Sequence, residues 1–230
     1  NPYILEHRGE YAPDFFVADW LASWPLYFGL SLEQTIYLNS FWWPLLFFLT
    51  LFVLFRKFGL PSNFAVVGAL ISYLSVLPLI ARPVIMQVVF PFYVLFLIAL
   101  INYLKAPRVK SNFLSLIILY AFSFYLYSYS WQISVLTIGL LTLWRFIGRR
   151  WPDFSSLMLV NLITFTLVLP VIGYTYLQVN SPFYWETMAR LGLVKTHLPT
   201  LLAVLDSGLV ILGLIVLFIF YRLTKSKNKN

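Results

Sequence analysis

Long apolar runs alternate with short polar turns along the 230 residues of the chain. Roughly 20 apolar residues in a helix cross the ~30 Å hydrocarbon core of a bilayer, because each residue adds about 1.5 Å. Several runs reach or approach that length, which predicts an all-α fold, a polytopic transmembrane helix bundle with about seven spans. The predicted spans cover residues 35–55, 64–80, 84–104, 113–128, 131–147, 154–178 and 201–221.

The fourth and fifth spans come from one apolar run, Phe113 to Ile147, whose 35 residues are too many for a single crossing. Its middle, Tyr125 to Trp131, is rich in tyrosine and serine. Amphipathic aromatic side chains favour the membrane–water interface. We therefore expect two short helices joined at a hydrated tip.

The positions of the charged residues support this count, because Lys and Arg in short loops are enriched on the cytoplasmic side. Alternation from an internal Arg56–Lys57 turn places twelve of the sixteen basic residues inside. The basic residues outside are Arg8, Arg82, Arg190 and Lys195. The acids outside are Glu6, Glu10, Asp14, Asp19, Glu33 and Glu186. The net charge of +8 therefore reflects mainly cytoplasmic anchors.

This topology predicts an integral protein of the plasma or inner membrane, with the lipid bilayer as its partner. Residues 1–34 form an extracytoplasmic loop, residues 179–200 a second outer loop and residues 222–230 a cytoplasmic basic tail. We expect an earlier span or signal upstream of Asn1, because the first residues lie outside. The tail is typical of an anchor near anionic headgroups and not of a nucleic-acid-binding segment. The sequence carries no signal for a particular oligomeric state.

Composition narrows the function by exclusion. Hydrophobic residues make up 61% of the chain and charged residues 10%, against about 25% charged residues in soluble domains. A soluble enzyme, a secreted disulfide domain and an ordinary nucleic-acid binder are therefore excluded. With no cysteine and only His7 and His197, a zinc site has no support, and no soluble-enzyme motif is present. A divalent cation held by carboxylates stays open as a cofactor.

The first outer segment, residues 1–34, carries most of the outer acids. The stretch from Asp14 to Trp24 has the apolar pattern of a short helix lying in the membrane interface, and Pro25 is expected to end it. On that helix Asp19 could point toward a cavity. The alternative is a solvated acidic loop with an aromatic surface helix and no catalytic function.

Three basic residues of the second outer segment, Arg190, Lys195 and His197, could face the acids of the first. Together they would form an anion pocket opposite a carboxylate. The alternative is a surface or re-entrant helix whose long cationic side chains reach toward water.

Arg82 and Asp206 stand out because of their positions. Arg82 precedes Pro83 at the outer end of a turn, where a guanidinium can bind a phosphate through two parallel hydrogen bonds. The alternative ligand is the phosphate of bulk lipid. Asp206 lies within the last predicted span, where an ionisable residue is a functional candidate. It could instead reach water or cap a neighbouring helix. Four amides are expected to form helix–helix hydrogen bonds: Gln87, Asn102, Gln132 and Asn161.

The layout resembles the C-type glycosyltransferase superfamily, polytopic enzymes that move sugars from polyprenyl-phosphate donors at the outer membrane face. The resemblance covers roughly residues 1–150 and is one of pattern. It rests on the acid-bearing loop Glu6–Gly29, the span from Leu30 to Gly59, the hairpin turning at Ala81–Pro83 and the short spans around Tyr125–Trp131.

The resemblance implies a direct displacement at the anomeric carbon of the donor. In that superfamily an acid of the first outer loop is the general base or a metal-linked carboxylate. Asp14 and Asp19 are the candidates here, with Glu6 and Glu10 behind them. Arg82, helped by Arg190 or His197, would stabilise charge on the leaving phosphate. The full set of candidate substrate-binding residues is Arg8, Arg82, Arg190, His197 and Asp206.

Two other functions fit the sequence. The chain could be a transporter or lipid flippase segment, in which Asp206, Arg82 and the tyrosine-rich tip line a pathway. Prolines interrupt several predicted spans, although no matched halves appear. It could also be a non-catalytic membrane subunit of a cell-envelope polysaccharide machine. The sugar and the acceptor are not specified by the sequence.

Overall fold

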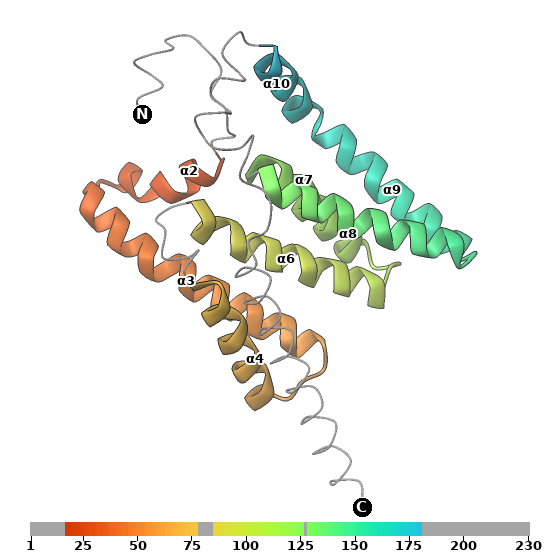
Figure 1. Ribbon diagram of the computed structural model, residues 1–230, viewed down its shortest axis with the longest axis horizontal. Helices are drawn as coiled ribbons and strands as arrows, with labels where there is room; N and C mark the ends of the chain where they lie inside the picture. Colours follow the sequence, from red (N-terminus) through yellow and green to blue (C-terminus); the bar gives the residue numbers. More distant parts are fainter. Residues whose placement is uncertain (1–16, 78–84, 127, 181–230) are drawn as a thin grey trace, which may run out of the picture. The chain divides into compact units, whose positions relative to one another are not determined.

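The computed structural model describes residues 17–77, 85–126 and 128–180. Within these ranges all regular structure is helical, with eight α-helices and one 3-10 helix (Figure 1). The predicted all-α class is therefore confirmed. The chain divides into two compact units, one holding residues 19–112 and the other holding residues 17–18 and 113–180 of the described part. Each unit is considered separately.

Helix α3, Leu32–Lys57, is the longest element of the first unit at 26 residues. It begins with a capping box, because the Ser31 hydroxyl accepts a hydrogen bond from the Gln34 amide at 3.2 Å and the Gln34 side chain accepts one from the Ser31 amide at 2.9 Å. Its last turn carries Arg56 and Lys57, whose charges complement the negative end of the helix dipole. The sequence thus defines both ends of this helix locally.

Helices α4, Ser62–Ser75, and α6, Ile85–Lys105, pack against α3. Their shared core is aliphatic and aromatic, and the ring of Phe47 lies 5.4 Å from that of Phe90 and 6.0 Å from that of Tyr73. The buried members are Phe47, Leu51, Leu54, Ala69, Val94 and Ile98. The α3 members follow helical spacing and form one stripe.

The second unit contains α7, Lys110–Leu126, from Phe113 onward, together with α8, Ser128–Ile147, α9, Trp151–Leu167, and α10, Leu169–Val179. Asn161 of α9 joins three helices, since it accepts a hydrogen bond from the Tyr120 hydroxyl at 3.3 Å and donates one to the Thr142 hydroxyl at 3.4 Å. This confirms the expected helix–helix role of Asn161. The ring of Phe124 stacks on that of Trp131 at 5.4 Å.

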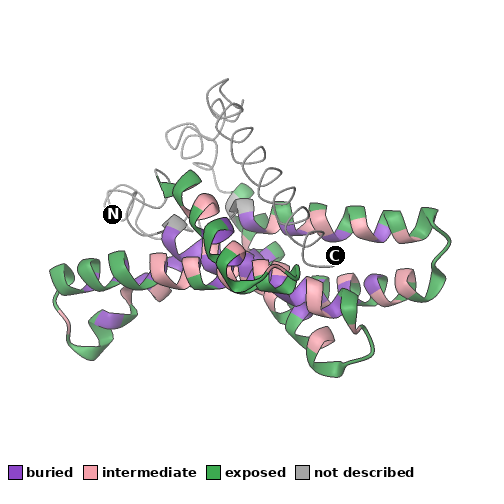
Figure 2. Cartoon of the chain, turned by 90° about the horizontal axis from the view of Figure 1, so that it is seen from below, coloured by how far each residue is buried: buried purple, intermediate pink, exposed green. Residues whose placement is uncertain are grey.

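Many apolar side chains of these helices face outward, and buried residues form narrow stretches between exposed ones (Figure 2). Exposed Trp, Phe, Leu and Ile occur along α3, α8 and α9. A monomer in water rarely exposes so much contiguous apolar surface. The helices therefore have the surface of an integral membrane protein in contact with lipid.

The predicted count of about seven spans is wrong for the described residues. Three helices are long and apolar enough to cross a membrane, over Leu32–Lys57, Gln87–Lys105 and Ser130–Ile147. A fourth exists if α9 and α10, which are bent by 50°, form one span. Two apolar helices fall short, since the 14 residues of Ser62–Ser75 rise only about 21 Å and Lys110–Leu126 has 17 residues. The predicted span 201–221 lies outside the described residues.

Candidate functional site

Asp19 is the one predicted site residue that the described part of the chain contains. The other candidates lie outside the described residues: Asp14, Arg8, Arg82, Arg190, His197 and Asp206. The site can therefore be built only around the segment that precedes α3.

That segment folds as two short helices, α2, Val17–Ser23, and η1, a 3-10 helix over Trp24–Phe28. Pro25 lies in the first turn of η1, so the α-helix changes to a 3-10 helix at this proline, whereas the sequence predicted a simple end. Gly29 closes η1 with a φ of 83° and an amide that donates to the Leu26 carbonyl at 3.0 Å. A positive φ is readily adopted by glycine, which explains the sharp entry into α3.

Asn39 of α3 holds this segment in place. Its side-chain nitrogen donates a hydrogen bond to the Ala22 carbonyl at 2.6 Å, and its side-chain oxygen accepts one from the Trp43 indole at 3.1 Å. Asn39 is only 7% exposed, so both amide ends are satisfied away from water. Sequence reasoning missed this contact. The only sign of this contact in the sequence is an amide, Asn39, four residues before Trp43 in an otherwise apolar helix.

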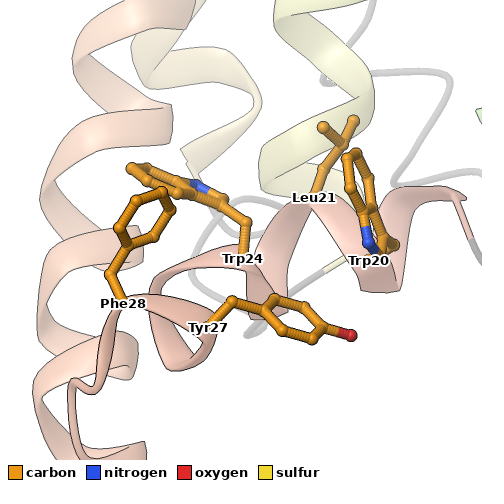
Figure 3. Close-up of a pocket in the computed structure, with 5 residues that line it drawn as sticks. All are labelled: Trp20, Leu21, Trp24, Tyr27 and Phe28. Carbon is orange, nitrogen blue, oxygen red and sulfur yellow. The ribbon is translucent and has the colours of Figure 1, made fainter.

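Beside this junction lies an open aromatic hollow of about 550 Å³, lined by Trp20, Leu21, Trp24, Tyr27 and Phe28. Figure 3 shows Trp24 and Phe28 on one side and Trp20 and Leu21 on the other. The Trp24 and Phe28 rings meet edge to face, with centroids 5.3 Å apart. Tyr27 and Phe28 are each 74% exposed. The volume is within the range of small-molecule sites, which are mostly apolar with few polar groups.

Asp19 lies in the first turn of α2. It directly precedes Trp20, which lines the hollow, but does not line the hollow itself. It is exposed, yet partial burial raises the pKa of its carboxyl above the ordinary value, because desolvation disfavours the charged form. No ion pair joins it to a cation in the described ranges. A raised pKa makes a carboxylate a better proton acceptor.

The site offers no metal centre of its own in the described part of the chain. No group of three or more His, Cys, Asp or Glu residues there could hold an ion. The described acids of this unit are Asp19 and Glu33, at the starts of α2 and α3. What the arrangement offers chemically is one partly desolvated carboxylate beside an apolar cradle.

Comparison with known proteins finds no match among family models, curated proteins or solved structures. The fold itself defines the class. The chain is a helical protein with several apolar helices of membrane length, as expected of a multi-pass integral membrane protein.

Proposed function

We propose that the chain functions as an integral membrane glycosyltransferase that moves a sugar from a polyprenyl-phosphate donor to an acceptor at the outer membrane face. One observation carries the proposal. Asp19, a carboxyl with a raised pKa, immediately precedes two residues that line an apolar hollow at the start of a membrane-length helix. A lipid-linked donor needs such a pairing of an apolar cradle and a proton acceptor at one membrane depth.

In the proposed reaction the acceptor hydroxyl oxygen attacks the anomeric carbon of the donor. The bond from that carbon to the phosphate oxygen breaks, and the polyprenyl phosphate leaves with the bonding electrons. Asp19 or Asp14 takes the hydroxyl proton as general base. Arg82, Arg190 and His197 stabilise the leaving phosphate, Arg8 and Asp206 bind substrate, and the prenyl chain rests in the hollow.

The sidedness of the site follows from the placement of basic residues and belongs to the same proposal. Arg56, Lys57 and Lys105 end α3 and α6, so these ends are cytoplasmic by the positive-inside rule. Asp19 and the hollow precede the opposite end of α3 and are therefore extracytoplasmic. The C-terminal basic tail is cytoplasmic in this topology.

A transporter or flippase segment is the second candidate, favoured by the broken helix pair α9–α10. The pair bends by 50° next to Pro170, and the Thr164 hydroxyl one turn before the bend is buried without a hydrogen-bond partner in the described residues. Broken membrane helices often provide transport sites. In that case Asp206→Asn would change the flux of substrate across the membrane without affecting any sugar-transfer reaction.

The enzyme hypothesis is tested by removing both candidate bases. Asp14→Asn/Asp19→Asn should lower sugar transfer from radiolabelled polyprenyl-phosphate hexoses by at least about 100-fold, because a positioned general base contributes 10²–10⁴-fold. Glu33→Gln is the matched control, since Glu33 is an exposed acid in the first turn of α3, and it should retain activity.

Expression and helical content of the double variant, measured by circular dichroism, should equal those of the parent protein. Full transfer activity in the double variant would refute these carboxylates as the base. If the parent protein transfers no hexose from any of the polyprenyl-phosphate hexoses tested, the chain is not this enzyme. A non-catalytic subunit then becomes the better description.

A further inference from the structure

Five basic residues lie where α3 and α6 both end, in the unit formed by residues 19–112. Arg56 and Lys57 belong to the last turn of α3 and Lys105 to that of α6. Arg108 follows in the next turn, and Lys110 begins α7. All five are exposed. We call this cluster the basic end.

A contact between the two helices builds the basic end. The Lys105 ammonium group donates a hydrogen bond to the backbone carbonyl of Lys57. Carbonyls in the last turn of a helix lack intrahelical partners, so this bond both caps α3 and ties α6 to it. Since the contact joins the final residues of both helices, α3 and α6 end at the same level.

The turn that follows α6 is also held in place. The Asn112 side-chain nitrogen donates hydrogen bonds to the Asn102 carbonyl at 3.1 Å and to the Ala106 carbonyl at 3.2 Å. The Val109 amide donates to the Ala106 carbonyl at 3.2 Å. Arg108 and Lys110 are therefore presented from a turn that is fastened to the end of α6.

The five cations divide into two kinds. The Arg56 guanidinium donates to the Leu60 carbonyl at 2.8 Å, and the Lys105 ammonium group donates to the Lys57 carbonyl. Both groups are therefore hydrogen-bonded to the backbone. The side chains of Lys57, Arg108 and Lys110 form no hydrogen bond or ion pair within the ranges that the structure describes.

No acid that the structure describes in this unit neutralises this charge. The acids that the structure describes in this unit are Asp19, in α2, and Glu33, in the first turn of α3. Both precede the body of α3, whereas the basic end follows it. The three uncommitted cations therefore present a locally uncompensated positive surface.

We propose that the basic end binds the phosphate headgroups of anionic phospholipids in the adjoining leaflet, through Lys57, Arg108 and Lys110. Leu32–Lys57 and Gln87–Lys105 are long and apolar enough to span a bilayer, so their charged last turns lie at headgroup depth. Basic clusters beside membrane helices attract anionic lipids. A soluble polyanion is a less favoured ligand, because it would have to displace lipid phosphates that already lie beside these cations. This inference is independent of the proposed enzyme activity.

The test uses the protein reconstituted in phosphatidylcholine vesicles with a trace of spin-labelled phosphatidylglycerol or spin-labelled phosphatidylcholine. Electron spin resonance measures the fraction of each label that is motionally restricted by the protein. The parent protein should prefer phosphatidylglycerol, and added salt should weaken the preference. Arg108→Gln/Lys110→Gln should reduce it at least about twofold, whereas the charge-conserving Arg108→Lys/Lys110→Arg should retain it.

Arg149→Gln/Arg150→Gln is the matched control, because it removes the same charge from the turn between α8 and α9. An equal loss in this control would show that lipid preference follows total charge, and would overturn a specific site at the basic end. Absence of any phosphatidylglycerol preference in the parent protein would also overturn the proposal. Binding of an oligonucleotide or an acidic peptide at the basic end, in place of anionic lipid, would overturn it as well. Circular dichroism verifies that each variant is folded.

Discussion

At the scale of single residues, the environment of Asp19 differs from that of the other described acids. Asp153 forms an ion pair with Arg145 at 3.3 Å. Asp19 has no such partner in the described part of the chain and is partly desolvated, so its pKa is raised. Folding thus disfavours the charged form of the Asp19 carboxyl relative to the unfolded chain.

The pH dependence of stability follows from this direction. The Asp19 carboxyl ionises near 3.8 when unperturbed and at a higher pH in the folded protein. Folding is therefore penalised progressively as the pH rises from about 3.8 through the raised value, and the penalty stays constant above it.

Asp19→Asn removes this penalty and should therefore raise the melting temperature at pH 7. The increase should be slight, because the carboxyl remains partly exposed, and the melting temperature near pH 3 should be unchanged. Paired thermal unfolding curves in detergent test this. A lower melting temperature of Asp19→Asn at pH 7 contradicts the desolvation argument.

At the scale of elements, local signals explain which parts of the structure could be predicted. The capping box at Ser31, the basic last turn of α3 and the apolar stripe between them are all readable along the sequence. The aromatic hollow was not readable, because it depends on the 3-10 turn at Pro25 and on the contact from Asn39 to Ala22. Such contacts between residues seventeen positions apart leave no periodic pattern.

Asn39 provides a test of how α2 is attached to α3. Asn39→Leu leaves the Ala22 carbonyl and the Trp43 indole without this partner, and a buried unsatisfied polar group costs about 1–3 kcal/mol. We expect a matching loss in the free energy of unfolding and faster proteolysis between α2 and α3. Thr50→Val is the control, because the buried Thr50 hydroxyl donates to the Phe47 carbonyl within α3, at 2.8 Å, and so joins no second helix among the described residues. If both variants lose equal stability, the contact does not fasten α2.

At the scale of the whole molecule, helix positions were easier to predict than span number. Apolar composition located the helices, but α4 and α7 stop short of a membrane crossing by length. Residues near a turn or a proline decide where each helix ends, as at the break between α9 and α10, which is followed by Pro170, the second residue of α10. Six of the seven predicted site residues lie outside the described ranges, so their mutual arrangement stays a prediction.

The contact between Lys105 and the Lys57 carbonyl has a consequence for topology. If α3 and α6 both span the membrane, and their last residues meet, the chain between them must return to the side from which α3 started. The absence of cysteine from the sequence makes this testable with single-cysteine variants. Glu33→Cys should react with a membrane-impermeant maleimide on one side of sealed vesicles, and Ser62→Cys and Ser111→Cys on the other. The three positions are exposed, so accessibility does not limit labelling. Reaction of Glu33→Cys and Ser111→Cys from the same side would exclude two spans that run in the same direction.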